Sequence, residues 1–163
     1  MPDYKVGVLT LSDSRKGDLQ NDLSGQKAKA ILEREGYKVL RHEVIADDLE
    51  DIIEKLNLWS KDLDLIITSG GTGLSKRDNT PEATKAVIDK EVPGISEALR
   101  SYSVSINLKG MLSRGVSGIK GETLIINLPG SPKAVDECLN YILPVLDHAL
   151  GILKGSIQDC ARK

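Results

Sequence analysis

Two short apolar runs constrain the fold of this chain more than any other feature of its sequence. Residues 65–68 (LIIT) and 124–127 (LIIN) are apolar at nearly every position and do not alternate with polar side chains. Such runs are typical of strands buried on both faces of a parallel sheet. We therefore expect strands over 63–68 and 123–128. Two further apolar runs predict strands over 6–11 and 37–45.

Helical patterns lie between these strands. They predict helices over 24–35, 48–60, 81–90 and 93–102, and a long last helix that starts at Ser131 and Pro132. Thr80 is expected to cap the third helix and Ser131 the last one. Pro144 should kink or divide the last helix. Residues 106–120 are expected to form a loop or an irregular hairpin.

This alternation of strands and helices predicts an α/β fold, a three-layer domain with a largely parallel central sheet. The length of 163 residues is close to that of one compact domain. We expect a single domain over residues 1–155, followed by a polar tail over 156–163.

Composition limits the partners and the compartment. The net charge of −2 argues against a surface built to bind nucleic acid. No segment reaches the roughly 18 apolar residues of a spanning helix, so no membrane partner is expected. Cys138 and Cys160 lie far apart in the sequence and fit free thiols in a reducing compartment, which predicts a cytoplasmic protein.

Ligands of such sheets bind beyond the carboxyl ends of the strands. The turn after the third strand contains three glycines within four residues and reads Ser69, Gly70, Gly71, Thr72, Gly73. Glycines let backbone N–H groups face a phosphate or carboxylate without obstruction. Neither the dinucleotide nor the P-loop pattern is present. A tight strand-to-helix turn remains the structural alternative.

Aspartates stand beside two of these turns. Asp78 precedes the third helix, and Asp47 and Asp48 follow the second strand. Each could simply stabilise a helix start. At one edge of a parallel sheet, however, two carboxylates could hold Mg²⁺, which usually shares phosphate oxygens with one or two carboxylates. Lys76 and Arg77 would then lie beside a phosphate, or else are solvated loop residues.

The remaining turns offer polar groups with weaker signals. Ser12 and Asp13 follow the first strand and could touch a ligand or form a local turn. The fourth strand leads into a turn and a helix start, a natural anion site, with the residues Asn127, Pro129, Gly130 and Ser131. His42 and His148 are far apart, so a zinc site is not expected. His42, between Arg41 and Glu43, is expected at the surface.

Together these segments resemble the molybdopterin adenylyltransferase family, over about residues 6–155. The most specific part is the glycine turn followed by RDNTPEAT at residues 77–84. Supporting segments are LTLSD (9–13), PG (93–94), MLSR (111–114), GIKG (118–121) and LIINLPGSP (124–132). Their order and spacing carry the resemblance.

The resemblance implies a Rossmann-like fold, a homotrimer, and transfer of AMP from Mg-ATP to the terminal phosphate of molybdopterin. It implies two catalytic, metal-binding aspartates, Asp78 and Asp47. Asp48 is the fallback, because this chain has Ala46 where the family commonly has proline. Asn79 replaces a usual valine. The implied nucleotide- and substrate-binding residues are Ser12, Asp13, Ser69, Gly70, Gly71, Thr72, Gly73, Lys76, Arg77, Thr80, Ser113, Arg114, Asn127, Pro129, Gly130 and Ser131.

Further partners and two alternatives follow from the same resemblance. A protein that inserts molybdenum is a possible partner. A catalytically silent pterin-binding or scaffold protein of the same fold is the first alternative, and a nucleotide-binding domain for another substrate is the second. The two aspartates and the basic pair Lys76 and Arg77 favour the enzyme.

Overall fold

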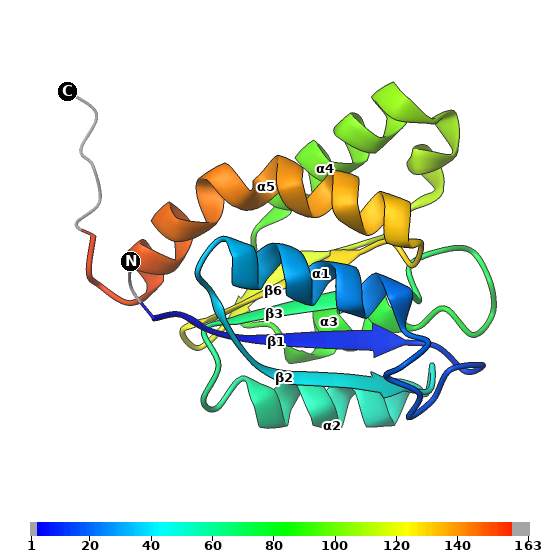
Figure 1. Cartoon of the computed structure of the whole chain (residues 1–163), viewed down its shortest axis with the longest axis horizontal. Helices are drawn as coiled ribbons and strands as arrows, with labels where there is room; N and C mark the ends of the chain where they lie inside the picture. The colour runs from blue at the N-terminus through cyan, green and yellow to red at the C-terminus, as the bar shows by residue number, and fades with distance from the viewer. Residues whose placement is uncertain (1–2, 158–163) are drawn as a thin grey trace.

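A six-stranded mixed sheet forms the centre of the protein in the computed structural model, which describes residues 3–157. The strand order is β2-β1-β3-β6-β5-β4 (Figure 1). The first four strands of this order are parallel to one another. At one edge β5 pairs antiparallel with β6, and β4 pairs antiparallel with β5. Their bounds in sequence order are β1 Lys5–Leu11, β2 Lys38–Ile45, β3 Leu65–Ser69, β4 Lys90–Glu91, β5 Ser117–Lys120 and β6 Thr123–Leu128.

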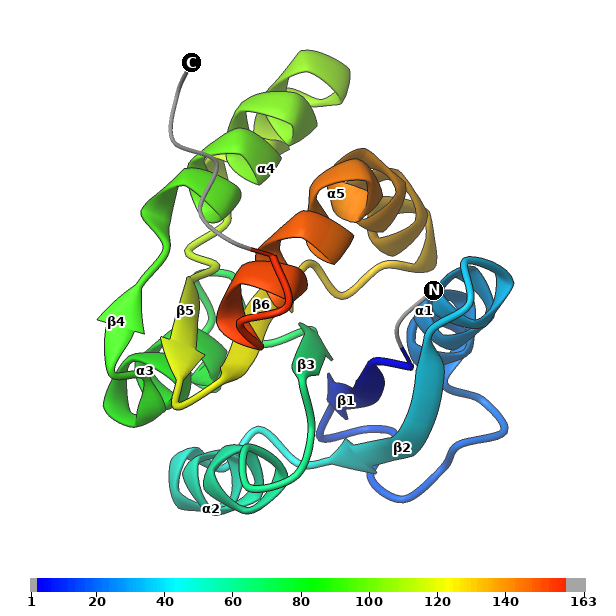
Figure 2. The ribbon, with the colours of Figure 1, turned by 90° about the vertical axis from the view of Figure 1, so that its left-hand side faces the viewer.

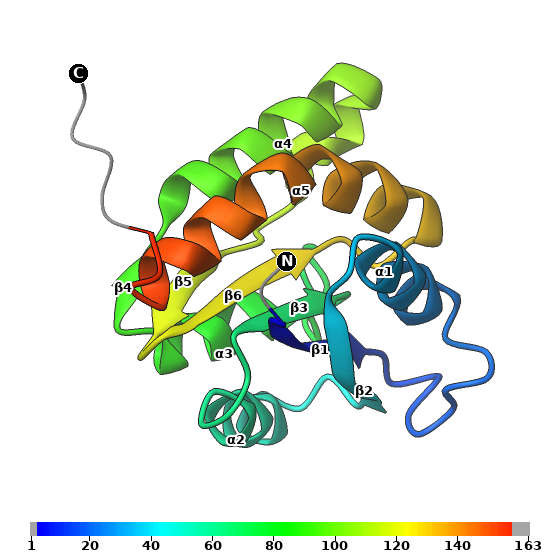
Figure 3. The same ribbon diagram turned by 60° about the vertical axis from the view of Figure 1, so that its left-hand side comes forward.

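Helices cover both faces of this sheet. One face carries α1 (Leu23–Arg34), α4 (Pro93–Ile106) and α5 (Pro132–Leu153) (Figure 2). The other face carries α2 (Leu49–Trp59) and α3 (Thr80–Val87). Figure 3 shows α4 lying alongside α5. A short 3₁₀ helix, η1 (Leu108–Leu112), follows α4. The predicted three-layer α/β fold is confirmed.

Two apolar clusters fill the spaces between the layers. Val8 and Ile67 point toward α1 and α5, whereas Leu9 and Ile66 point toward α2 and α3. Successive strand residues thus enter opposite clusters, which explains why the central strands are apolar at nearly every position. Gly7 leaves room for the ring of Trp59, since a Cβ there would lie 2.6 Å from a ring carbon.

Several boundaries differ from the expectations. The third helix ends at Val87 because the chain then turns into β4, and the fourth continues to Ile106. Residues 106–120 contain η1 and β5, and β5 forms a hairpin with β6. Pro144 does not divide α5, because apolar side chains on both sides of it pack into the core.

Thr80 is not the helix cap that its position predicted. Asn79 occupies the cap position, and the Thr80 hydroxyl donates to the Gly70 carbonyl at 2.9 Å instead. Ser131 does cap α5, accepting from the N–H of Ala134. Within residues 3–157 no helix is both long and apolar enough to cross a membrane. Cys160 and most of the predicted tail lie outside the described residues.

Candidate functional site

Four parallel strands end at one edge of the sheet and bring the predicted turns together. The register pairs Leu11 with Ile45, and Ser69 with both Thr10 and Leu128. The loops that follow therefore leave from the same level, at the right of Figure 1. This alignment depends on the parallel pairing and is the reason that distant sequence segments can form one site.

The glycine turn is packed too tightly for side chains. Gly70 and Gly71 have φ angles of 95° and 68°, a region that other residues rarely adopt. A Cβ on Gly130 would lie 3.3 Å from the Cα of Gly70. The Ser69 hydroxyl donates to the Pro129 carbonyl at 3.0 Å. The predicted glycine and Pro-Gly turns are therefore in direct contact.

Asp47 is a buried carboxylate at this turn, with 8% of its surface exposed. Its Oδ2 accepts from the N–H of Asp13 at 3.2 Å. Its Oδ1 is the one buried side-chain polar atom within residues 3–157 that has no hydrogen-bond partner. A Cβ on Gly71 would lie 3.0 Å from that oxygen. Asp48 instead caps α2, so Asp47 is the carboxylate that faces the glycine turn.

The surroundings of Asp47 favour its neutral form. Burial raises the pKa of its carboxyl group, and the negative charges of Asp13 and Asp78 raise it further. The hydrogen bond from the Asp13 N–H and the charge of Arg77 oppose this shift. A nearby cation would reverse the balance, because it would favour the charged carboxylate.

Asp78 lies beside the same glycine turn, close enough for its charge to act on Asp47. Its Oδ2 accepts from the N–H of Ser75 at 3.0 Å, and a Cβ on Gly73 would lie 2.9 Å from it. The residues fit Mg²⁺, since a buried carboxylate oxygen of Asp47 lacks a partner and a second carboxylate is near. Asp47 and Asp78 are two carboxylates, and the described residues contain no group of three or more His, Cys, Asp or Glu side chains that could hold a metal.

Asp13 and Arg77 hold each other across the site. The Arg77 guanidinium donates to both carboxylate oxygens of Asp13, at 2.8 and 2.9 Å. This ion pair and the N–H of Asp47 lower the pKa of Asp13 to about 2. Both residues were predicted to bind a ligand, but here they bind each other. Lys76 is exposed beside them, and the Ser12 hydroxyl lies 3.3 Å from that of Ser14.

Arg114 is bound to the backbone of the glycine turn. Its own N–H donates to the Thr72 carbonyl at 2.8 Å. Its side chain donates through Nε to the Gly73 carbonyl at 2.7 Å and through Nη2 to the Asp78 carbonyl at 2.8 Å. A third side-chain nitrogen pairs with Glu82. The resemblance implied that Arg114 contacts the substrate. In the structure its side chain holds the backbone of the glycine turn.

A pocket of about 390 Å³, here called the main pocket, opens beside the glycine turn. Five of the predicted site residues line it: Thr72, Gly73, Ser113, Pro129 and Ser131. Lys109 and Lys133 also line it, and the sequence reasoning did not identify either. Basic residues on separate helices carry no spacing signal for a common site, because only the fold brings them together.

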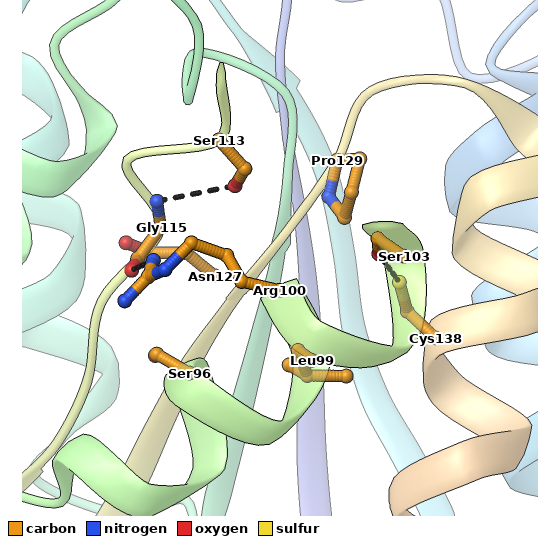
Figure 4. Close-up of a pocket in the computed structure, with 9 residues that line it drawn as sticks. All are labelled: Ser96, Leu99, Arg100, Ser103, Ser113, Gly115, Asn127, Pro129 and Cys138. Carbon is orange, nitrogen blue, oxygen red and sulfur yellow. Dashed lines mark hydrogen bonds between the residues drawn. The ribbon is translucent and has the colours of Figure 1, made fainter. Parts of the chain in front are cut away.

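A small cavity of about 10 Å³, here called the α4 cavity, lies along α4 (Figure 4). Ser103, Ser113 and Pro129 line both spaces. Asn127, a predicted ligand residue, lies on its wall. Its side-chain amide donates to the hydroxyls of Thr68 and Thr84, and its oxygen accepts from the Val116 N–H. Its polar atoms thus join β6 to its neighbours.

His42 is not at the surface, contrary to its expected position. Its side chain is 12% exposed, and its Nε2 lies 2.7 Å from Oδ2 of the fully buried Asp22. The Thr10 hydroxyl and the Gly25 N–H donate to the same carboxylate. Asp22 caps α1, and a helix-start aspartate was the sequence signal that could have revealed it.

The fold and this edge define the class of protein: an α/β domain with a glycine turn and polar side chains at the carboxyl ends of its parallel strands, where such domains bind ligands. The comparisons with known proteins give the particular family. A family described as "Probable molybdopterin binding domain" matches residues 7–148. Because this match spans most of the sequence, the chain belongs to that family, whose relatives act in molybdenum cofactor biosynthesis.

Three relatives illustrate the similarity. The chain is 37% identical to the molybdopterin adenylyltransferase of Helicobacter pylori, covering 100% of this chain and 95% of that protein. It is 39% identical to the molybdenum cofactor biosynthesis protein B of Bacillus cereus, covering 90% and 88%. The structure of the molybdopterin biosynthesis Mog protein from Mycobacterium ulcerans superimposes with a TM-score of 0.87 at 37% identity, covering 95% and 99%.

Proposed function

We propose that this protein is a molybdopterin adenylyltransferase that transfers AMP from Mg-ATP to the terminal phosphate of molybdopterin. The observation that carries the proposal is the pair of aspartates beside the glycine turn, with one buried oxygen of Asp47 left without a partner. The names of relatives that cover nearly the whole chain support the same reaction.

The reaction needs positioning more than it needs a strong base. A phosphate oxygen of molybdopterin attacks the α-phosphorus of ATP, one P–O bond forms, and the bond between the α-phosphorus and its bridging oxygen breaks. Pyrophosphate leaves with the electron pair of that bond. The attacking phosphate is already an anion at neutral pH. In-line alignment and neutralisation of charge therefore dominate the barrier.

The residues of this chain can meet those requirements. Amides of the glycine turn would face the phosphates, and Arg114 holds the turn in place. Asp47 and Asp78 would hold Mg²⁺, which supplies neutralisation of charge on the pyrophosphate group. Lys109 adds positive charge to the main pocket, where Lys133 is paired with Glu137 at 3.9 Å. No step requires a nucleophilic side chain of the protein.

Three further properties follow from the family resemblance and are proposed with the reaction. The protein forms a homotrimer, acts in the cytoplasm, and passes its product to a protein that inserts the metal. A native mass measurement by light scattering tests the trimer, and a monomeric mass at micromolar concentration would contradict it.

The reaction is tested by incubating the protein with α-labelled ATP, Mg²⁺ and molybdopterin. Labelled adenylylated product is expected from the wild type and not from Asp78→Ala. Product from Asp78→Ala at the wild-type rate would refute the assignment of Asp78. A well-folded wild type that binds molybdopterin but forms no product would instead identify a pterin-binding protein.

A further inference from the structure

Arg100 on α4 is a partly buried cation without a carboxylate partner. Its Nη1 donates to the Gly115 carbonyl at 2.7 Å, and no other side-chain hydrogen bond of Arg100 is present within residues 3–157 (Figure 4). No carboxylate within residues 3–157 lies at ion-pair distance from it, whereas Arg77 and Arg114 each have one. Removing an arginine charge from water without a counter-charge is unfavourable. The charge of Arg100 is therefore available to an anionic ligand in the space that it lines.

A second pocket, here called the side pocket, opens next to Arg100. It has a volume of about 250 Å³ and lies between the end of α3, the start of α4 and the loop before β5. Its charged lining residues are Lys85, Arg100 and Arg114 against a single carboxylate, Glu91. Arg114 is paired with Glu82, whereas Lys85, like Arg100, has no ion-pair partner within residues 3–157. The pocket therefore has an excess of positive charge.

The side pocket lies next to the main pocket, and Ser113 lines both. The α4 cavity between them, which has room for about one water, shares Ser96, Arg100 and Gly115 with the side pocket. It shares Ser103 and Pro129 with the main pocket, and Ser113 lines all three spaces. A ligand in the main pocket that reaches past Ser113 would bring one group toward Arg100.

We propose that Arg100, assisted by Lys85, is an anion-binding subsite that takes a phosphate group of a ligand in the adjoining main pocket. Anion binding follows from the cavity and its charges alone, and only the identity of the phosphate rests on the proposed function. Arginine and lysine are the side chains that proteins use most directly for phosphate. The phosphate belongs either to the nucleotide or to the molybdopterin.

The subsite is tested by titrating the protein with inorganic pyrophosphate in the presence of EDTA. Isothermal titration calorimetry measures the affinity. Arg100→Gln should weaken binding at least tenfold, because it removes the positive charge. Glu91→Gln should tighten binding, because it removes the one carboxylate of the pocket. Lys61→Gln, far away beside Asn57 and Gly121, should bind as the wild type does. Thermal unfolding confirms that each variant is folded.

The affinity for pyrophosphate should rise in Glu91→Gln and fall in Arg100→Gln. This difference separates an effect of charge from structural damage, since a disturbed fold would weaken binding in both variants. Unchanged affinity in Arg100→Gln, weaker binding in Glu91→Gln, or no binding by the wild type would overturn the proposal. Pyrophosphate binding in EDTA requires neither Mg²⁺ nor molybdopterin, whereas AMP transfer requires both. Failure of AMP transfer and failure of the subsite are therefore distinguishable.

Competition assigns the phosphate to its source. If saturating ATP abolishes pyrophosphate binding at Arg100, the subsite takes a nucleotide phosphate. If molybdopterin does so and ATP does not, it takes the phosphate of the acceptor. If neither competes, the link between the side pocket and the ligand of the main pocket is wrong.

Discussion

Asp47 is a charged side chain in surroundings that favour its neutral form. Its pKa is raised by burial and by the charges of Asp13 and Asp78, and one of its oxygens has no partner. The folded protein therefore carries an electrostatic cost at this residue whenever the carboxyl group is ionised. Such costs persist at functional sites, where a bound cation can offset them.

Asp47→Asn is expected to stabilise the protein at neutral pH while lowering AMP transfer at least about 100-fold. Because the folded-state pKa is raised, the destabilisation is absent below pH 3.8, grows as the pH rises through the folded-state pKa, and then stays constant. The gain at pH 7 should be about 1 kcal/mol, or a rise in Tm of roughly 2–4 °C. Thermal unfolding at pH 7 and pH 3 checks it, and a lower Tm at pH 7 would contradict the argument.

Asp13 shows the opposite behaviour. Its pKa is lowered to about 2 by Arg77 and by the Asp47 N–H. The stabilisation from this pair is present above pH 3.8 and is lost as the pH falls toward 2. In Arg77→Gln, the pKa of Asp13 should rise toward its ordinary value of 3.8. Carboxyl carbon shifts in an NMR titration measure the change. An unaltered pKa would show that the ion pair does not form in solution.

At the scale of elements, the glycine turn depends on contacts from three other segments. Thr80 of α3 donates to the Gly70 carbonyl, Arg114 donates to the Gly73 carbonyl, and Ser69 joins the turn to Pro129. The turn contains no regular hydrogen-bonded structure of its own. Its conformation is therefore set by these contacts and by the freedom of glycine.

Gly71→Ala should destabilise the protein by about 1–3 kcal/mol, from its positive φ and from a Cβ placed against Asp47 and Thr80. Gly17→Ala is the matched control, since Gly17 has a similar φ of 73° but no atom within 4 Å of the added Cβ. Urea unfolding of both variants isolates the contact. Equal losses would mean that the turn relaxes away from Asp47.

Arg114→Lys should slow AMP transfer at least about tenfold, because lysine cannot donate simultaneously to the Gly73 and Asp78 carbonyls from a planar fork. We expect the loss mainly in kcat, with faster hydrogen exchange in the glycine turn. Glu82→Gln keeps both carbonyl contacts and should remain close to the wild type. A loss confined to KM would instead favour direct contact between Arg114 and substrate.

For the whole molecule, the site joins loops from four strands, so ligand binding should stabilise the entire domain. Mg-ATP at 100 times its Kd should add about 2.7 kcal/mol to the free energy of unfolding. The Mg²⁺-dependent part should be lost in Asp47→Asn and Asp78→Asn. Differential scanning fluorimetry with and without EDTA measures this. If Mg²⁺ stabilises both variants as much as it stabilises the wild type, the metal binds elsewhere.

The sequence by itself determined the layers of the protein and the list of turns that meet at the site. Apolar residues at nearly every position of the central strands favour a sheet covered on both faces, and parallel pairing then sends the following loops to one edge. The glycine turn and the two aspartates could be predicted for this reason. Burial patterns and backbone freedom depend on residues that are adjacent in the sequence, so the sequence alone can reveal them.

Only the tertiary structure decided what those side chains contact. It distinguished Asp47 from Asp48, paired Asp13 with Arg77, placed Arg114 against the glycine turn and buried His42 on Asp22. It also left Arg100 without a counter-charge beside a pocket. These contacts join residues 20 to 64 positions apart or lie across different layers. No local pattern encodes them, because they depend on how separate elements pack.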